Sequence, residues 1–248
     1  MRNFKLKIEY DGGRYDGWQR LGANESTNTI ERKITDVLTK MTGEEIVLAV
    51  GLRTEQGVHA YGQTASFQCN TKQSCREILH YLNRYLPRDI AVIDVMEMPE
   101  RFHASLNAKS RTYLYRIDVN EVPDVFERRY KYNAFKRLDA EKMKQACKLL
   151  CGVHDFRKFS SAKKNKSTVK EIYRAEVFDD GGEVQITLEA NDFLHNMARL
   201  IFGTLLLVGN KELEPEEILK MLDAKSEVKP ETMADTCGMF LQEIKYDK

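Results

Sequence analysis

The sequence has no long apolar run, no Cys-x-x-Cys pair and almost no net charge. Its longest apolar run, from Leu200 to Gly209, is too short to span a bilayer. The chain opens with alternating charged and apolar side chains, a pattern unlike the apolar core of a secretory signal peptide. We therefore expect a cytoplasmic protein with no membrane association. The 248 residues are enough for one large domain or two modest ones.

The cysteines and histidines show neither a disulfide pattern nor a metal-binding pattern. An odd number of cysteines without a Cys-x-x-Cys pair argues against both a disulfide framework and a zinc ribbon. We expect reduced and mostly buried thiols at Cys69, Cys75, Cys147, Cys151 and Cys237. His59, His154 and His195 lack ligand spacing beside a third ligand, so we expect no metal site.

Positive charge is concentrated in two stretches, although the formal net charge is only +1. Residues 156–170 (FRKFSSAKKNKSTVK) contain six cations and no acid. Residues 128–137 (RRYKYNAFKR) interleave five cations with three aromatic residues. Such stretches are typical either of solvated surface or of an RNA-binding surface, where cations meet phosphates and rings stack on unpaired bases.

The first half of the chain has the pattern of alternating strands and helices. Asn28 and Glu31 form a plausible capping pair for a first helix with apolar residues at helical spacing. A capping box formed by Ser74 and Glu77 begins a second helix, which ends before Pro87. Strands are predicted at 4–10, 45–50, 62–68, 90–98 and 111–119, and the first helix spans about 30–41.

The second half repeats this pattern. A helix at 139–151 precedes two strands, 171–178 and 183–190, joined by the hairpin signal DDGG. A long helix at about 193–208, a shorter one opened by Pro215 and a strand at 239–246 follow. We expect an α+β fold in which two similar α/β halves, 1–106 and 107–248, share a continuous, mostly antiparallel sheet with helices packed on one face.

Six segments carry a family resemblance that runs in order through nearly the whole chain. They are IEYDGGRYDGWQR (8–20), RTEQGVHAYGQ (53–63), LPRDIAV (86–92), FHASLNAKSRTYLYRI (102–117), GVHDFRKF (152–159) and FLHNMARLIFGTLLLVG (193–209). Together they resemble the tRNA pseudouridine synthase A family. Each segment alone is weakly specific, whereas six collinear segments are highly specific.

The resemblance implies the pseudouridine synthase fold and a cofactor-free isomerase, which needs neither a metal nor a nucleotide cofactor. Such an enzyme acts as a homodimer on tRNA, cuts the glycosidic bond of selected uridines in the anticodon stem-loop, and rejoins the base through carbon. A base inside a stem must first be flipped into a pocket that stacks and hydrogen-bonds it. A carboxylate must then act as nucleophile or base at the sugar or the ring.

The resemblance also assigns roles to individual residues. In the loop 51–63, Arg53 matches the arginine that helps to hold the base out of the stack, and Glu55 stands where the family has its catalytic aspartate. Tyr113 matches the tyrosine that stacks on the uracil, and Arg199 matches the arginine that pairs with the aspartate. We further expect substrate contacts from His59, Arg20, Lys163, Lys164 and Lys166.

The loop departs from the family pattern Gly-Arg-Thr-Asp-Ala-Gly-Val-His at three positions, occupied here by Leu52, Glu55 and Gln56. Acidity is not the difficulty, because the ordinary pKa values of Asp and Glu differ by only about 0.4. Geometry matters more, since a displacement on the order of 1 Å can cost about 10²-fold in rate. If the family's glycine has a positive φ, Leu52 costs roughly 1–2 kcal/mol.

Two hypotheses follow from this departure. In the first, the chain is an active synthase whose loop has changed its conformation to accommodate Glu55. The retained residues Arg53, Tyr113 and Arg199 favour this interpretation. In the second, the chain is a catalytically impaired RNA-binding paralogue that binds or remodels tRNA without isomerising it. The clustering of three changes in one loop favours the second hypothesis.

Overall fold

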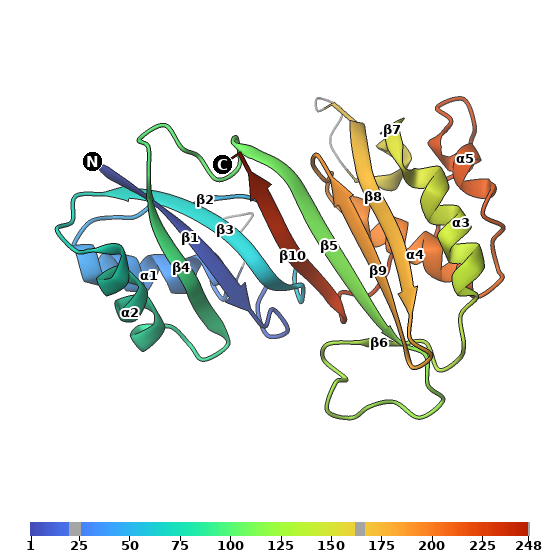
Figure 1. The fold of residues 1–248 in the computed structure, drawn as a ribbon, viewed down its shortest axis with the longest axis horizontal. Helices are drawn as coiled ribbons and strands as arrows, with labels where there is room; N and C mark the ends of the chain where they lie inside the picture. The colour runs from blue at the N-terminus through green and yellow to red at the C-terminus, as the bar shows by residue number, and fades with distance from the viewer. Residues whose placement is uncertain (20–25, 162–166, 248) are drawn as a thin grey trace. The chain divides into compact units, whose positions relative to one another are not determined.

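Strands and helices alternate along the chain in a computed structural model that describes residues 1–19, 26–161 and 167–247. The chain divides into two compact units (Figure 1). The first unit comprises Met1–Lys109 and Phe240–Lys248, and the second comprises Ser110–Met239. Both units combine helices with mostly antiparallel strands, which confirms the predicted α+β class.

The first unit is built on a twisted set of strands in the order β4-β1-β3-β10, with β2 paired to β3. Strand β1 is antiparallel to both neighbours, whereas β10 runs parallel to β3. Phe4, Leu6 and Ile8 alternate along β1 and are fully buried, as the period of a strand dictates. The elements are β1 (Arg2–Tyr10), α1 (Ile30–Thr42), β2 (Ala49–Val50), β3 (His59–Cys69), α2 (Cys75–Tyr85), β4 (Ile90–Met98) and β10 (Met239–Tyr246).

The second unit places its strands in the order β5-β9-β8-β7, each antiparallel to the next, with β6 parallel to β5. Helix α4 is apolar on nearly every side, and Ile201, Phe202 and Leu205 are fully buried. The elements are β5 (Ala108–Asp118), β6 (Tyr132–Asn133), α3 (Ala140–Leu150), β7 (Gly152–Asp155), the 3-10 helix η1 (Arg157–Phe159), β8 (Val169–Asp179), β9 (Glu183–Ala190), α4 (Met197–Gly209) and α5 (Glu217–Leu222).

The predicted N-caps of helices α2 and α1 can be compared with the structure. The capping box predicted at Ser74 is present, because Ser74 accepts from the Glu77 amide and the Glu77 carboxylate accepts from the Ser74 amide. The cap predicted for α1 at Asn28 is wrong by one residue. Thr29 caps that helix through the Arg32 amide, while the Asn28 side chain donates to the Arg14 carbonyl at 2.7 Å.

Two further element boundaries differ from the prediction. Helix α4 begins four residues later than expected, because Asn196 adopts a left-handed conformation with φ of 64° directly before it. The strand predicted at 45–50 is reduced to Ala49–Val50, the two residues that pair with β3. In both cases the side-chain pattern does not mark the residue at which the regular element begins.

The described helices include none that is long and apolar enough to cross a membrane. All five thiols are free. Cys69 and Cys147 are buried, and burial raises the pKa of Cys147 to about 12. The remaining three cysteines are only half-buried, so the expectation of mostly buried thiols is met at two positions.

Candidate active site

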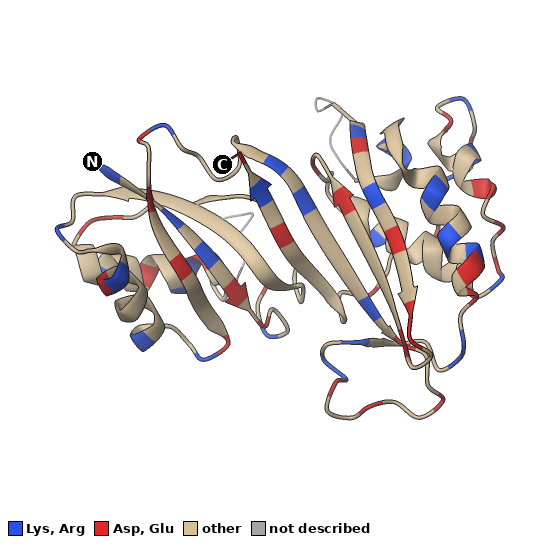
Figure 2. Ribbon diagram, in the orientation of Figure 1, with Lys and Arg blue, Asp and Glu red and all other residues tan. Residues whose placement is uncertain are grey.

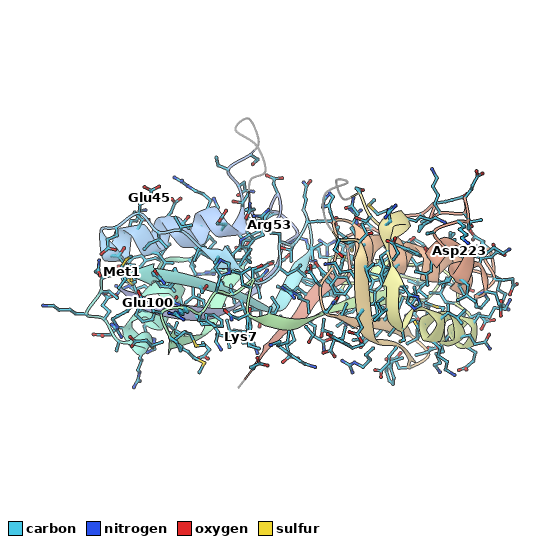
Figure 3. All side chains as sticks on the ribbon, turned by 90° about the horizontal axis from the view of Figure 1, so that it is seen from above. Met1, Lys7, Glu45, Arg53, Glu100 and Asp223 are labelled. Atoms are coloured by element: carbon cyan, nitrogen blue, oxygen red, sulfur yellow. The ribbon has the colours of Figure 1, made fainter. Side chains whose placement is uncertain are left out.

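The loop between β2 and β3 carries two of the predicted site residues. Arg53 is exposed (Figure 3), Glu55 is half-buried, and Thr54 between them is buried. The loop is therefore anchored at Thr54, while the arginine on one side and the carboxylate on the other remain accessible. A fixed backbone between two charged side chains is what a site needs to place both on one substrate.

Three residues outside the connection between β2 and β3 (51–58) tie it to the rest of the first unit. The Tyr10 hydroxyl and the Thr54 hydroxyl share a buried hydrogen bond of 2.7 Å, and the Trp18 amide donates to the Thr54 carbonyl at 3.0 Å. The Gln63 side chain donates to the Leu52 carbonyl at 2.7 Å and to the Tyr10 hydroxyl at 3.3 Å. Burial raises the pKa of Tyr10 to about 12, so this hydroxyl stays protonated at neutral pH.

Two glycines allow the chain after β1 to approach the loop closely. A Cβ atom at Gly12 would lie 1.9 Å from the Val58 carbonyl oxygen. Gly17 has a φ of +88°, and a Cβ atom there would lie 2.8 Å from the Thr54 carbonyl oxygen. Any larger residue at either position would have to push the loop away.

The substituted loop positions fit the observed backbone. Leu52 carries no positive φ, because the described residues other than glycine with that conformation are Phe135, Asn196 and Lys211. The strain cost considered for Leu52 therefore does not arise. Gln56 donates through Nε2 to the Asp16 carboxylate at 3.1 Å, which adds a link between the loop and the segment before α1.

Charges close to the loop come from the first turn of α1. Burial raises the pKa of Glu31, and the positive charge of Arg53 partly offsets that rise. Arg53 thus lies within electrostatic reach of a carboxylate other than Glu55.

His59, predicted to contact substrate, is buried at the start of β3. Its Nδ1 atom lies 3.0 Å from the Asp11 carboxylate and 3.1 Å from the Gly12 amide nitrogen, and its ring stacks on Phe240 at 4.8 Å. Nδ1 cannot serve both polar partners at once, because a proton on it favours Asp11 and its absence favours the Gly12 amide. In this position His59 supports the base of the loop.

The other two predicted catalytic residues belong to the second unit. Tyr113 lies on β5, is 5% exposed, and meets Phe193 edge-on at a ring distance of 5.1 Å. Arg199 is half-buried on α4, and its Nε donates to the Ala234 carbonyl at 2.9 Å while its own carbonyl accepts from the Ala234 amide at 3.0 Å. Contacts within their own unit thus hold both side chains.

The remaining predicted contacts, Arg20, Lys163, Lys164 and Lys166, lie outside the described residues. Sequence reasoning missed the supporting roles of Tyr10, Trp18 and Gln63. The signal was available, since all three fall within the quoted segments 8–20 and 53–63. Their roles become visible only when the hydrogen bonds between those two segments are known.

The structure thus has an α+β fold with Arg53 and Glu55 on one loop. The resemblance to the tRNA pseudouridine synthase A family implies such an arrangement. Comparison with known proteins identifies the family. The family model described as tRNA pseudouridine synthase matches residues 7–107 and 146–247. The chain therefore belongs to the tRNA pseudouridine synthase family and is an isomerase.

Curated relatives match over the whole chain. The protein named tRNA pseudouridine synthase A 2 of Bacillus cereus is 44% identical, and tRNA pseudouridine synthase A of Bacillus sp. strain KSM-64 is 42% identical. The protein named tRNA pseudouridine synthase A 1 of Clostridium tetani is 40% identical. Each match covers 99% of this chain and 100% of the relative.

Proposed function

We propose that this chain converts uridine to pseudouridine in the anticodon stem-loop of tRNA, with Glu55 as the reacting carboxylate. The observation that carries the proposal is the loop itself. Glu55 is half-buried next to Thr54, whose hydroxyl and carbonyl are both hydrogen-bonded to residues outside the loop. A carboxylate held in this way is positioned for chemistry, and the names of the relatives point to tRNA as the substrate.

The reaction rearranges one nucleotide without loss or gain of atoms. The bond between C1′ of the ribose and N1 of the uracil breaks, a bond between C1′ and C5 forms, the C5 proton leaves to solvent, and N1 gains a proton. Glu55 serves as nucleophile or base in this sequence. Arg53 helps to hold the flipped nucleotide, Tyr113 stacks on the uracil, and Arg199 pairs with the carboxylate.

The wider setting of the enzyme belongs to the same proposal. The protein acts in the cytoplasm as a homodimer and needs no cofactor, because the isomerisation has no net redox or hydrolytic step. The tRNA contacts include Arg20, Lys163, Lys164 and Lys166, where cations can meet phosphates. His59 contributes to substrate binding by supporting the loop from its buried position.

The test measures catalysis and binding separately. Tritium release from unmodified tRNA labelled at C5 of uridine reports isomerisation, and filter retention of the same tRNA reports binding. We expect release by the native protein and at least about a 10³-fold loss in Glu55→Gln, which keeps the side-chain shape but removes the charge. Retention of tRNA by both proteins without release by either would support the impaired RNA-binding paralogue instead.

A further inference from the structure

The turn between β9 and α4 links the two candidate catalytic side chains of the second unit. This segment, residues 191–196 (NDFLHN), is called the pre-α4 turn below. Its Phe193 ring meets Tyr113 on β5 edge-on, with 5.1 Å between the ring centroids. Arg199 is the third residue of α4, which follows the turn directly. The position of the pre-α4 turn therefore bears on both side chains.

Charged side chains from two strands hold the start of the pre-α4 turn. The Asp192 carboxylate lies 2.8 Å from the Lys170 ammonium on β8 and 3.8 Å from Arg111 Nε on β5. Arg111 also donates through Nη1 to the Asn191 carbonyl. Cationic residues lie on both strands (Figure 2). Asp192 is thus a carboxylate that ties the turn to β5 and β8 together.

The cationic partners of Asp192 have little access to solvent. The side chains of Arg111 and Lys170 are 7% and 15% exposed, whereas that of Asp192 is 41% exposed. Partly buried ion pairs are screened by salt less than surface pairs. Removing the carboxylate charge would leave two poorly solvated cations beside a neutral side chain, which is unfavourable. We therefore expect the turn to shift when Asp192 loses its charge.

Hydrogen bonds anchor the two ends of the pre-α4 turn. The Asn191 amide donates to the Glu171 carbonyl at 3.0 Å, and the Asn191 side-chain oxygen accepts from the Glu171 amide at 3.1 Å. At the other end, Asn196 Nδ2 donates to the Ser161 hydroxyl at 2.9 Å. Between these anchors, the orientation of the turn depends on its charged contacts.

We propose that Asp192 is a positioning residue that holds the Tyr113 ring in the orientation needed to stack on the flipped uracil. Its ion pairs with Lys170 and Arg111 set the pre-α4 turn, and the turn sets the Phe193 ring. The edge-on contact of that ring with Tyr113 favours one relative orientation of the two rings. This inference rests on the proposed function, which gives Tyr113 its stacking role. A tyrosine ring displaced by on the order of 1 Å would misalign the base and slow the reaction.

The first test separates catalysis from binding. With unmodified tRNA labelled at C5 of uridine, Asp192→Asn should lower kcat for tritium release about tenfold or more and change KM less than about twofold. Asp192→Glu keeps the charge and should recover part of kcat. The matched control is Glu214→Gln, which removes a carboxylate that pairs with Lys142 at 2.7 Å in the same unit and should keep the native kcat.

The second test observes the Tyr113 ring and does not require an active enzyme. In protein labelled with 3-fluorotyrosine, the fluorine resonance of Tyr113 is the one that is lost in Tyr113→Phe. Phe193→Leu should shift this resonance, because the edge-on ring is removed. Asp192→Asn should shift it in the same direction, and Glu214→Gln should leave it in place.

Several outcomes would overturn the proposal. An unchanged Tyr113 resonance in Asp192→Asn does so, and so does a native kcat in that variant. A higher KM at unchanged kcat also overturns it and assigns Asp192 to tRNA binding. If Asp192→Asn does not fold, Lys170→Gln removes the opposite charge of the same pair and carries the same expectations. A native protein that releases no tritium contradicts the proposed function, whereas the resonance still decides whether Asp192 holds the Tyr113 ring.

Discussion

Replacing Tyr10 with phenylalanine removes a single oxygen from beneath the loop that carries Arg53 and Glu55. The Thr54 hydroxyl then loses its 2.7 Å hydrogen bond, and Gln63 Nε2 loses the longer of its two hydrogen bonds. Thr54 is 5% exposed and Gln63 is fully buried, so water cannot readily replace the lost partner. A buried polar group left unsatisfied costs about 1–3 kcal/mol. We expect the free energy of unfolding to fall by that amount in Tyr10→Phe.

The matched control is the same change at Tyr115. The Tyr115 hydroxyl is buried and has no hydrogen-bond partner among the residues that the structure describes. Tyr115→Phe should therefore be neutral or slightly stabilising. Urea denaturation followed by circular dichroism measures both variants. Equal destabilisation by the two changes, or none by Tyr10→Phe, would refute the view that the Tyr10 hydroxyl holds the loop.

Two further predictions test other parts of the account. Gly17→Ala should lower tritium release and destabilise the protein by roughly 1–2 kcal/mol or more, because the added Cβ would meet the Thr54 carbonyl oxygen. The control is Gly43→Ala, which has a similar φ but open space around the added Cβ and should keep its activity. Burial alone would raise the pKa of Glu183, but hydrogen bonds from Arg116 and other partners lower it from 4.5 to about 2. The stability that this carboxylate contributes is therefore present above about pH 4.5 and is lost as pH falls toward 2. Glu183→Gln should lower Tm at pH 7 and much less at pH 2, and an equal loss at both pH values would contradict the assigned role of the charge.

The fold was predictable where local signals dominate. Helix α2 and strands β4 and β10 lie where the capping box and the apolar runs place them. The beginning of α4 was not predictable, because the apolar residues Phe193 and Leu194 are buried although they precede the helix, and the left-handed backbone at Asn196 delays its start. The strand predicted at 45–50 was too long for a related reason, since only Ala49 and Val50 find partners on β3.

The sequence predicted which residues belong to the candidate site, but not the contacts that hold them. The segment resemblance identified the loop with Arg53 and Glu55. It did not reveal that Tyr10, 44 residues away in sequence, shares a hydrogen bond with Thr54. It also suggested a substrate contact for His59, and it did not reveal that this ring is buried against Phe240. Contacts between distant segments decide both points, and no local pattern encodes them.

Tritium release by the native protein beside Glu55→Asp tests most directly whether Glu55 is the working carboxylate. The loop backbone is held by the hydrogen bonds of Thr54, so shortening the side chain at position 55 moves the carboxylate on the order of 1 Å and should slow the reaction by up to about 10²-fold. The account predicts an active native protein and a weaker Glu55→Asp variant, with equal tRNA retention by both. A silent native protein and a gain of activity in Glu55→Asp would contradict it, because the loop would then be a disabled form of one built for aspartate.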